Sequence, residues 1–398
     1  MGVAVALAIV LLLVGLGGGY VWGNSTAKSS STSSVQLTET GSSLLYPLMT
    51  SWAAAYTGAT ISAASTGSGT GQSDAETGLV NIGASDGYLT TAAANNLINV
   101  PVAISAQLVY YNLPGLTGHL NLNGTMLAEI YNGTITTWND PLILNAQNAS
   151  LKTALNGLAS ETIHPIKRAD SSGDTFLFTS FCYESWAKWL FGYGTSNLTG
   201  DTAATGATGN SGMVSALNST ANSVAYVGIS YEASAGAEPN HLQYAALGDN
   251  NASTTAGGIV AANYILPTST TISQDANLGL NGLNFTADQL EISLILGGSS
   301  AGPVTLSLGG GGSMPTLASP APYPIVNLEY MLIKTAPTGS VVTSTALAAT
   351  VAFLQWAISI GNWASGGTES TFLSAVHFIP LTPAVAGYDM QELATVQP

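Results

Sequence analysis

The chain has 398 residues, of which 7% are charged and only six are Lys or Arg, against about 25% charged residues in ordinary soluble proteins. The formal net charge at pH 7 is −15, so long-range attraction cannot gather nucleic acid or anionic lipid onto this surface. A small anion in a closed cleft remains possible, because hydrogen bonds, dipoles and one local charge decide its binding there.

Size and composition predict a folded protein with two domains. A hydrophobic content of 46% and seven Trp are typical of a packed core. The roughly 360 residues that follow the N-terminal segment exceed the size at which single cores stop growing. One cysteine, Cys182, excludes an intrachain disulfide.

The N-terminus predicts an extracellular protein held at a membrane. Residues 1–24 carry no charged side chain and are long enough to span a bilayer. A cleaved signal peptide usually has a basic start and a shorter apolar core, so we expect a retained membrane anchor, with cleavage and secretion as the alternative. Residues 25–36 form a Ser/Thr-rich stalk. Eight Asn-x-Ser/Thr sequons fit a glycoprotein: Asn24, Asn123, Asn132, Asn148, Asn197, Asn218, Asn251 and Asn284.

The periodicity that follows predicts alternating strands and helices. After the short strand VQLTET, apolar residues at steps of four from Leu44 to Tyr56 predict one face of a helix. Residues 80–89 and 107–113 have the composition of buried strands. Such alternation predicts an α/β architecture, in which ligands bind at the carboxyl ends of the strands.

The second half of the chain continues this pattern. Residues 126–143 predict a helix, residues 323–334 a returning strand and residues 346–364 a long amphipathic helix. The Gly-rich stretch 297–315 has the composition of a loop.

No enzyme class has its reactive groups at a recognisable spacing. Four scattered His and a single Cys offer no metal motif. The sequence GSGTG at 67–71 lacks the lysine of a nucleotide-binding P-loop, and no G-x-S-x-G elbow occurs. We therefore expect neither catalysis nor a cofactor.

Three helix starts offer donors for an anion. Residues 171–192 open with Ser and Gly and continue with apolar residues at helical steps from Phe178 to Trp189. The unpaired N–H groups of that first turn carry about half a positive charge. The sequences TGSSLLYP (40–47) and STGSGTG (65–71) have the same character. Arg168, the only arginine, stands four residues before Ser172 and could add a bidentate fork. Taken singly, each feature also fits a structural ion pair or a helix cap.

The order of these motifs resembles a known family. TGSSLLYP, then STGSGTG with the Asp of GASD 18 residues after Ser68, then RADSSGDTF, resembles the phosphate-binding protein of the ABC-type high-affinity phosphate importer. The resemblance continues through IYNGTITTWND, VAYVGISYEA, YPIVNLEYMLI, FLQWAI and IPLTP, and covers roughly residues 37–385.

The resemblance implies a two-lobed, type II periplasmic-binding-protein-like fold whose lobes are joined by crossing hinge strands. Lobe 1 would comprise residues 37–112 and 326–398, and lobe 2 residues 113–325. The lobes would close on one dehydrated inorganic phosphate and deliver it to ABC permease subunits. Asp170 would orient the arginine. The implied phosphate ligands are Ser43, the backbone at Leu44, Ser68, Asp86, Arg168, Ser172 and Gly173.

Two positions depart from the family pattern. Leu44 replaces an aromatic residue, which a backbone N–H contact would survive. Asp174 replaces a hydroxyl donor with a carboxyl, and we include it in the ligand set. It would either accept a second phosphate proton, as an adaptation to an acidic exterior, or serve as a first-turn acid of the helix.

Two other functions stay open at this point. The first is binding of another tetrahedral oxyanion such as sulfate or molybdate, against which a buried Asp86 argues, because two unpaired acceptors would face each other. The second is a structural cell-surface or filament protein that keeps the fold without the ligand. Retention of the sole arginine inside the anion motif counts against this second alternative.

Overall fold

The computed structural model describes residues 34–158, 161–186, 188–237, 242–248, 254–255, 258–259, 264–280, 298–299, 302–303, 323–363 and 370–398. The predicted anchor at 1–24 and stalk residues 25–33 lie outside the described residues, as does the Gly-rich stretch 297–315 apart from the short strands β14 (Gly298–Ser299) and β15 (Gly302–Pro303). None of the helices in the described ranges combines the length and hydropathy that a membrane crossing requires.

One large mixed sheet organises the described fold, with the strand order β2-β1-β3-β16-β4-β8-β6-β7 and with β9 paired to β4. Its strands are β1 (Gln36–Gly41), β2 (Thr60–Ser65), β3 (Ile82–Ser85), β4 (Leu97–Asn112), β6 (His164–Arg168), β7 (Thr205–Ala207), β8 (Ser223–Gly228), β9 (Gln243–Tyr244) and β16 (Val326–Lys334). The predicted strands at 80–89, 107–113 and 323–334 are confirmed within β3, β4 and β16.

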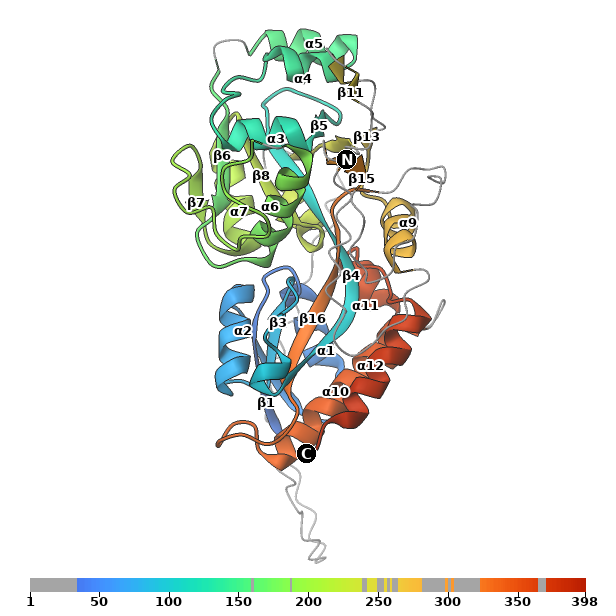
Figure 1. The fold of residues 1–398 in the computed structure, drawn as a ribbon. Coiled ribbons are helices and arrows are strands. Elements are labelled where there is room, and N and C mark those ends of the chain that lie inside the picture. The colour runs from blue at the N-terminus through green and yellow to red at the C-terminus, as the bar shows by residue number, and fades with distance from the viewer. Residues whose placement is uncertain are drawn as a thin grey trace, which may run out of the picture. The chain divides into compact units, whose positions relative to one another are not determined.

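Strand β4 is long enough to belong to both lobes. Its first part pairs antiparallel with β16 as far as Ala106, and its second part, from Gln107, pairs antiparallel with β8. Figure 1 shows β4 and β16 running side by side through the middle of the fold. The predicted two-lobed α/β fold with crossing strands is therefore confirmed, and the change of partner occurs between Ala106 and Gln107.

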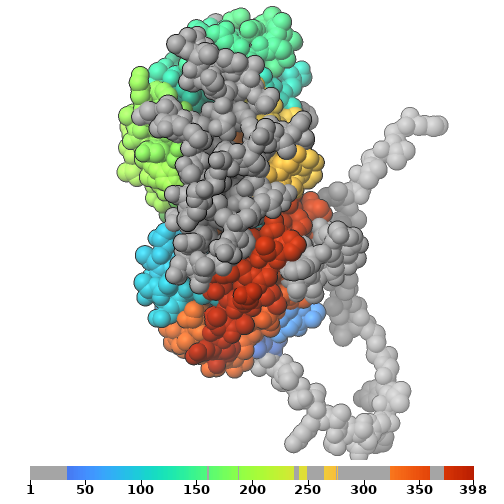
Figure 2. Space-filling view, turned by 45° about the vertical axis from the view of Figure 1, so that its right-hand side comes forward, coloured from blue at the N-terminus to red at the C-terminus, as the bar shows by residue number. Residues whose placement is uncertain are grey.

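Helices cover both faces of the lobe 1 sheet. Helix α2 (Ser68–Thr77) packs against β1 and β3, whereas α10 (Ser344–Trp363) and α12 (Pro383–Thr395) lie on the other side (Figure 1). Residues 370–398, with the short α11 (Ser370–Ala375), form one strip on the surface, red in Figure 2. The predicted apolar face of the first helix is confirmed for Leu48 and Trp52, which α1 (Tyr46–Ala55) buries, whereas Leu44 and Tyr56 lie just outside this helix.

Lobe 2 surrounds β8, β6 and β7 with helices. Those next to the strands are α6 (Gly173–Ser185) and α7 (Gly209–Ser219), and α3 (Gly124–Tyr131) packs on α6. The lobe further contains α4 (Pro141–Ala146), α5 (Ala149–Asn156), α8 (Glu232–Ala237), α9 (Ser269–Leu280) and a small sheet of β5 (Asn121–Asn123), β10 (Ala246–Gly248) and β13 (Tyr264–Ile265).

Two helix predictions in this lobe are wrong in extent. The helix predicted over 126–143 is two helices, because α3 ends before Gly133, whose φ of 75° no helix accommodates, and Asp140 caps the start of α4. The helical spacing predicted through Trp189 stops at Ser185, since Trp186 is extended.

One predicted sequon is inaccessible to a glycan. Asn123 is 3% exposed, and its side-chain oxygen caps α3 by accepting from the Met126 N–H at 2.9 Å. The Asn123 side chain therefore stabilises the start of α3 and is not available for a glycan. Asn24, Asn251 and Asn284 lie outside the described residues.

Two acidic side chains are buried in the lobe 1 core, which composition did not reveal. Glu39 on β1 is 2% exposed and Asp389 on α12 is fully buried. Within the described ranges no ion pair reaches either residue, and Glu39 Oε2 and both Asp389 carboxyl oxygens lack a hydrogen-bond partner. Burial raises the pKa of Glu39 from 4.5 to about 8, and it raises the pKa of Asp389 well above its usual range. Both carboxyls are therefore protonated in acid.

These carboxyls predict a protein that loses stability as the pH rises from 4.5 toward 8. Because the folded-state pKa of Glu39 is raised, its contribution to stability is complete below pH 4.5 and is lost as the pH rises toward 8. At about 1.4 kcal/mol per pKa unit, the effect amounts to a few kcal/mol. Urea unfolding at pH 4 and pH 8 measures it, and Glu39→Gln should flatten the dependence. Equal stability of the wild type at the two pH values would contradict the prediction.

Candidate anion-binding site

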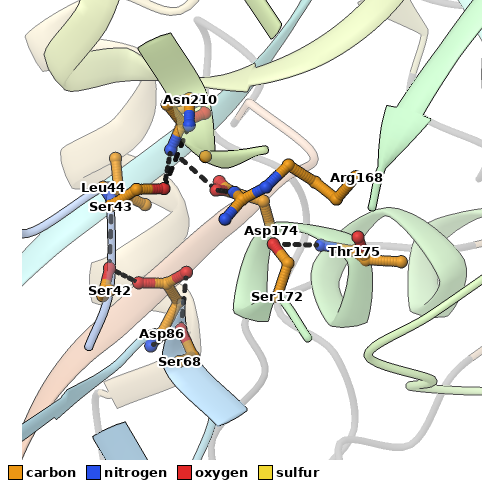
Figure 3. A network of polar contacts seen from close by, with 12 residues as sticks. Ser42, Ser43, Leu44, Ser68, Asp86, Arg168, Ser172, Asp174, Thr175 and Asn210 are labelled. Atoms are coloured by element: carbon orange, nitrogen blue, oxygen red, sulfur yellow. Dashed lines mark hydrogen bonds and ion pairs between the residues drawn. The ribbon is translucent and has the colours of Figure 1, made fainter. Parts of the chain in front are cut away.

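The ends of three strands bring the candidate residues together. Ser43 follows β1, Asp86 follows β3 and Arg168 is the last residue of β6. Carboxyl ends of parallel strands meet at one edge of a sheet, where ligands bind in α/β proteins. Figure 3 shows these side chains converging with those of α2, α6 and α7.

Arg168 is held by two carboxylates on its own side of the cleft. The side chain is 1% exposed, and its Nε donates to Asp170 Oδ1 at 2.7 Å while Nη2 donates to Asp170 Oδ2. Its Nη1 donates to Asp174 Oδ2 at 2.7 Å. Asp170 Oδ1 also accepts from the Gly209 N–H at 3.1 Å. Burial alone would raise the pKa of Asp170, but the bond to Arg168 and its charge lower it, so this pair is ionised.

Asp174 lies in the first turn of α6, and its carboxyl also contacts the arginine. Its fully buried carboxyl accepts from Arg168, from Asn210 Nδ2 at 2.7 Å and from Gln107 Nε2 at 3.4 Å. Ser172 is the N-cap of α6, accepting from the Thr175 N–H at 3.3 Å. Burial, and next the Asp86 charge, raise the pKa of Asp174 to about 7. In acid this group is therefore neutral and can donate as well as accept.

Asp86 is the acidic group of lobe 1 in the site. It is 1% exposed, receives hydrogen bonds from Ser42 Oγ and, at 3.1 Å, from Ser68 Oγ, and its own N–H donates to Ser68 Oγ at 3.2 Å. Burial raises the pKa of Asp86 despite these bonds and the Arg168 charge. Asp86 thus brings a buried carboxyl of lobe 1 into the same region as the arginine of lobe 2.

The first loop makes contacts that the sequence did not predict. The Leu44 N–H, an implied ligand, donates to Ser42 Oγ at 3.0 Å. The hydroxyl oxygen of Ser43 accepts from the Asn210 backbone N–H at 3.1 Å and from its Nδ2 at 3.0 Å. Ser42 was not in the predicted set, although it adjoins Ser43 in the same motif. The residues of the predicted ligand set all lie around the cleft between the two lobes.

Asn210 and Gln107 are site residues that sequence reasoning missed. Asn210 stands in the first turn of α7, after Gly209 with φ of 65°. The sequence TGNSG at 208–212 has the same character as the three predicted helix starts and could have revealed this fourth one. Gln107 sits where β4 changes partner, which depends on strand pairing and therefore had no sequence signal.

The lobes touch directly around the site. Besides the bonds between Ser43 and Asn210, the Gly69 N–H donates to the Ser171 carbonyl at 3.1 Å, and Ser230 Oγ donates to the Leu44 carbonyl at 2.8 Å. A Cβ at Gly173 would lie 2.5 Å from Asp86 Cβ and Oδ2. The described structure is thus a closed form in which only glycine fits at the start of α6.

No group of His, Cys, Asp and Glu suited to a metal ion occurs in the part of the chain that the structure describes. The chemistry of the site is instead that of an anion receptor. It offers one guanidinium, several hydroxyls and the first-turn N–H groups of helices, which carry partial positive charge.

Gly173→Ala should hold the lobes apart, because the added methyl group meets Asp86 across the lobe boundary. Small-angle scattering should give a larger radius of gyration than for the wild type. Gly387→Ala is the matched control, since it also lies in a helix and a Cβ there meets nothing within 4 Å. Identical scattering of the two variants would refute this account of Gly173.

Comparison with known proteins agrees with this geometry. Residues 26–359 match the family model described as a PBP superfamily domain. The chain is 33% identical over 233 residues to the phosphate-binding protein PstS of Xylella fastidiosa (strain 9a5c), covering 56% of this chain and 61% of that protein. It is 33% identical over 276 residues to the phosphate-binding protein PstS3 of Mycobacterium bovis (strain BCG), covering 65% of this chain and 70% of that protein. The chain thus spans less than two thirds of the length of the first relative.

Solved structures share the fold at lower identity. A high affinity periplasmic phosphate-binding protein (PfluDING) bound with phosphate has a TM-score of 0.62 and 17% identity, covering 89% of this chain and 92% of that chain. The phosphate-binding protein from Stenotrophomonas maltophilia has a TM-score of 0.59 and 19% identity, covering 90% and 93%. With a matching family model over most of its length, the chain belongs to the PBP superfamily and, within it, to the family of the PstS phosphate-binding proteins.

Proposed function

We propose that this protein captures inorganic phosphate between its two lobes and delivers it to the permease subunits of an ABC importer. The observation that carries the proposal is the convergence of a buried guanidinium from lobe 2 and a buried carboxyl from lobe 1, Arg168 and Asp86, beside the start of α6. The relatives whose names specify phosphate binding support it.

The acidic group favours phosphate over other tetrahedral oxyanions. Sulfate and molybdate are unprotonated near neutral pH, so an ionised Asp86 would face their oxygens without a proton between the two acceptors. Phosphate keeps at least one proton, which Asp86 can accept. The hydroxyls of Ser42 and Ser68 already donate to both carboxyl oxygens and so hold Asp86 in the geometry of an acceptor.

We further propose that the protein acts outside the cell membrane and without catalysis. The names of the relatives describe binding proteins, and a receptor that opens and closes has a natural partner in a permease that reads the closed form. A membrane anchor at 1–24 would keep the receptor near that permease. The alternative of a structural filament protein rests on residues 1–24, which lie outside the described residues.

Arg168→Ala should remove most of the phosphate affinity. A buried charge pair of this kind is worth about 2 to 5 kcal/mol of binding, which corresponds to a loss of about 30-fold or more. Titration calorimetry of residues 36–398 with phosphate measures the loss. Lys152→Ala, which removes a cation from α5 of the same lobe, is the control and should leave binding unchanged. A loss below about tenfold would make the arginine structural.

Asp174 should set the upper pH limit of phosphate binding. Because its pKa is raised to about 7, the group is neutral in acid and becomes an anion beside Arg168 as the pH rises through 7. Wild-type affinity should therefore fall above pH 7 more steeply than the titration of phosphate explains. Asp174→Thr and Asp174→Asn cannot ionise and should retain binding to higher pH. An unaltered pH profile in both variants would exclude this role.

A further inference from the structure

A second carboxyl lies behind Asp86, outside every predicted ligand position. Glu329, in β16, is fully buried. Its Oε1 accepts from Ser105 Oγ and, at 3.4 Å, from Asn327 Nδ2. The same Asn327 amide donates to the Asp86 main-chain carbonyl, so this part of β16 is tied to the loop that carries Asp86.

The unpaired second oxygen of Glu329 indicates that this carboxyl carries a proton. Within the described residues, Oε2 has no hydrogen-bond partner. Strands β16 and β3 pair antiparallel with Tyr330 opposite Ser85, so the next residues along the pair, Glu329 and Asp86, are neighbours. Two ionised carboxylates offer only acceptors and cannot form a hydrogen bond. With one proton between them, they form a strong charge-assisted bond and the otherwise unpaired oxygen is satisfied.

The charges around the pair also require a proton. Asp86, Asp174 and Glu329 are all buried, and the charges of Asp86 and Asp174 both disfavour an ionised Glu329. The guanidinium of Arg168 already pairs with Asp170. Burial, and next the charge of Asp86, raise the pKa of Glu329 well above its usual range. Adding a phosphate anion to this site with every carboxyl ionised would bury uncompensated negative charge, which is strongly unfavourable.

The proton belongs on Glu329 more than on Asp86. Asp86 receives hydrogen bonds from two hydroxyls and feels the charge of Arg168, and these contacts favour its ionised form. Glu329 receives weaker support, from Ser105 and a long bond from Asn327. A neutral Glu329 that donates to Asp86 satisfies both groups.

We propose that Glu329 is a protonated positioning residue that donates its proton to Asp86 and thereby keeps Asp86 an ionised acceptor for the phosphate proton. This inference rests on the proposed phosphate function. Without the Glu329 donor, Asp86 would take up a proton itself and become a donor. A donor at that position tolerates an unprotonated oxyanion, so Glu329 determines the selectivity for phosphate over sulfate without touching either ligand.

The test compares two substitutions at one position. Glu329→Gln keeps a donor for Asp86 and an acceptor for Ser105, whereas Glu329→Leu removes both. Glu39→Gln is the matched control, because it makes the same change at another buried carboxyl of lobe 1, which no described hydrogen bond joins to Asp86. Equilibrium dialysis with labelled phosphate, with and without competing sulfate, gives the affinities of both anions.

Glu329→Leu should weaken phosphate binding by about tenfold or more, as expected for a lost bond to a charged group, and should lower the ratio of phosphate to sulfate affinity. Glu329→Gln should restore that ratio, and Glu39→Gln should leave it at the wild-type value. A purely structural role would weaken both anions equally and keep the ratio in Glu329→Leu. That result would overturn the proposal, as would a lower ratio in Glu329→Gln.

Infrared spectroscopy of the ligand-free protein supplies a readout that needs neither phosphate nor the Leu variant. The carbonyl stretch of a protonated carboxylic acid should be present at neutral pH, and Glu329→Gln should remove one such band. No difference between the spectra of wild type and Glu329→Gln would mean an ionised Glu329 and would refute the inference. If the wild type bound no phosphate while the band was present, the proposed function would fail and the protonation of Glu329 would stand.

Discussion

The closed site depends on one buried cation surrounded by acids. Arg168 cannot lose its proton, so every neighbouring carboxyl must either pair with it or become neutral. Asp170 pairs with Arg168 through two hydrogen bonds. Asp174 makes one bond to the same guanidinium, and its pKa of about 7 allows it either state near neutral pH. The ordering of the loop between β6 and α6 follows from this pairing, because Asp170 also accepts from Gly209 at the start of α7.

The crossing of β4 links the two lobes beside the site. The strand passes from one lobe to the other at Gln107, whose amide donates to the Asp174 carbonyl at 2.7 Å. Gln107 therefore connects the point where β4 changes partner with the anion site. Asp86 meets Gly173 across the lobe boundary, so both lobes supply groups to the site and neither encloses it alone.

Several buried carboxyls of this protein are kept neutral by protonation and not by pairing with a cation. Glu39, Asp389 and Glu329 are all buried with their pKa values raised chiefly by burial, and the whole chain has only six Lys and Arg to pair with 21 acids. Neutral carboxyls avoid the desolvation cost that ionised ones would carry. Low pH keeps these carboxyls neutral, and the six Lys and Arg are then too few for strong mutual repulsion.

The sequence by itself determined the α/β class, the helix start at Ser172 and the candidate positions of Arg168 and Asp86, because periodicity, capping residues and motif order are local properties of the chain. It could not determine which oxygen contacts which donor. Only the tertiary structure decided that the first-turn acid Asp174 also contacts Arg168, Asn210 and Gln107, because the last two residues come from distant segments. The partnership of Glu329 with Asp86 likewise depends on β16 lying next to β3, a pairing between residues far apart in the chain.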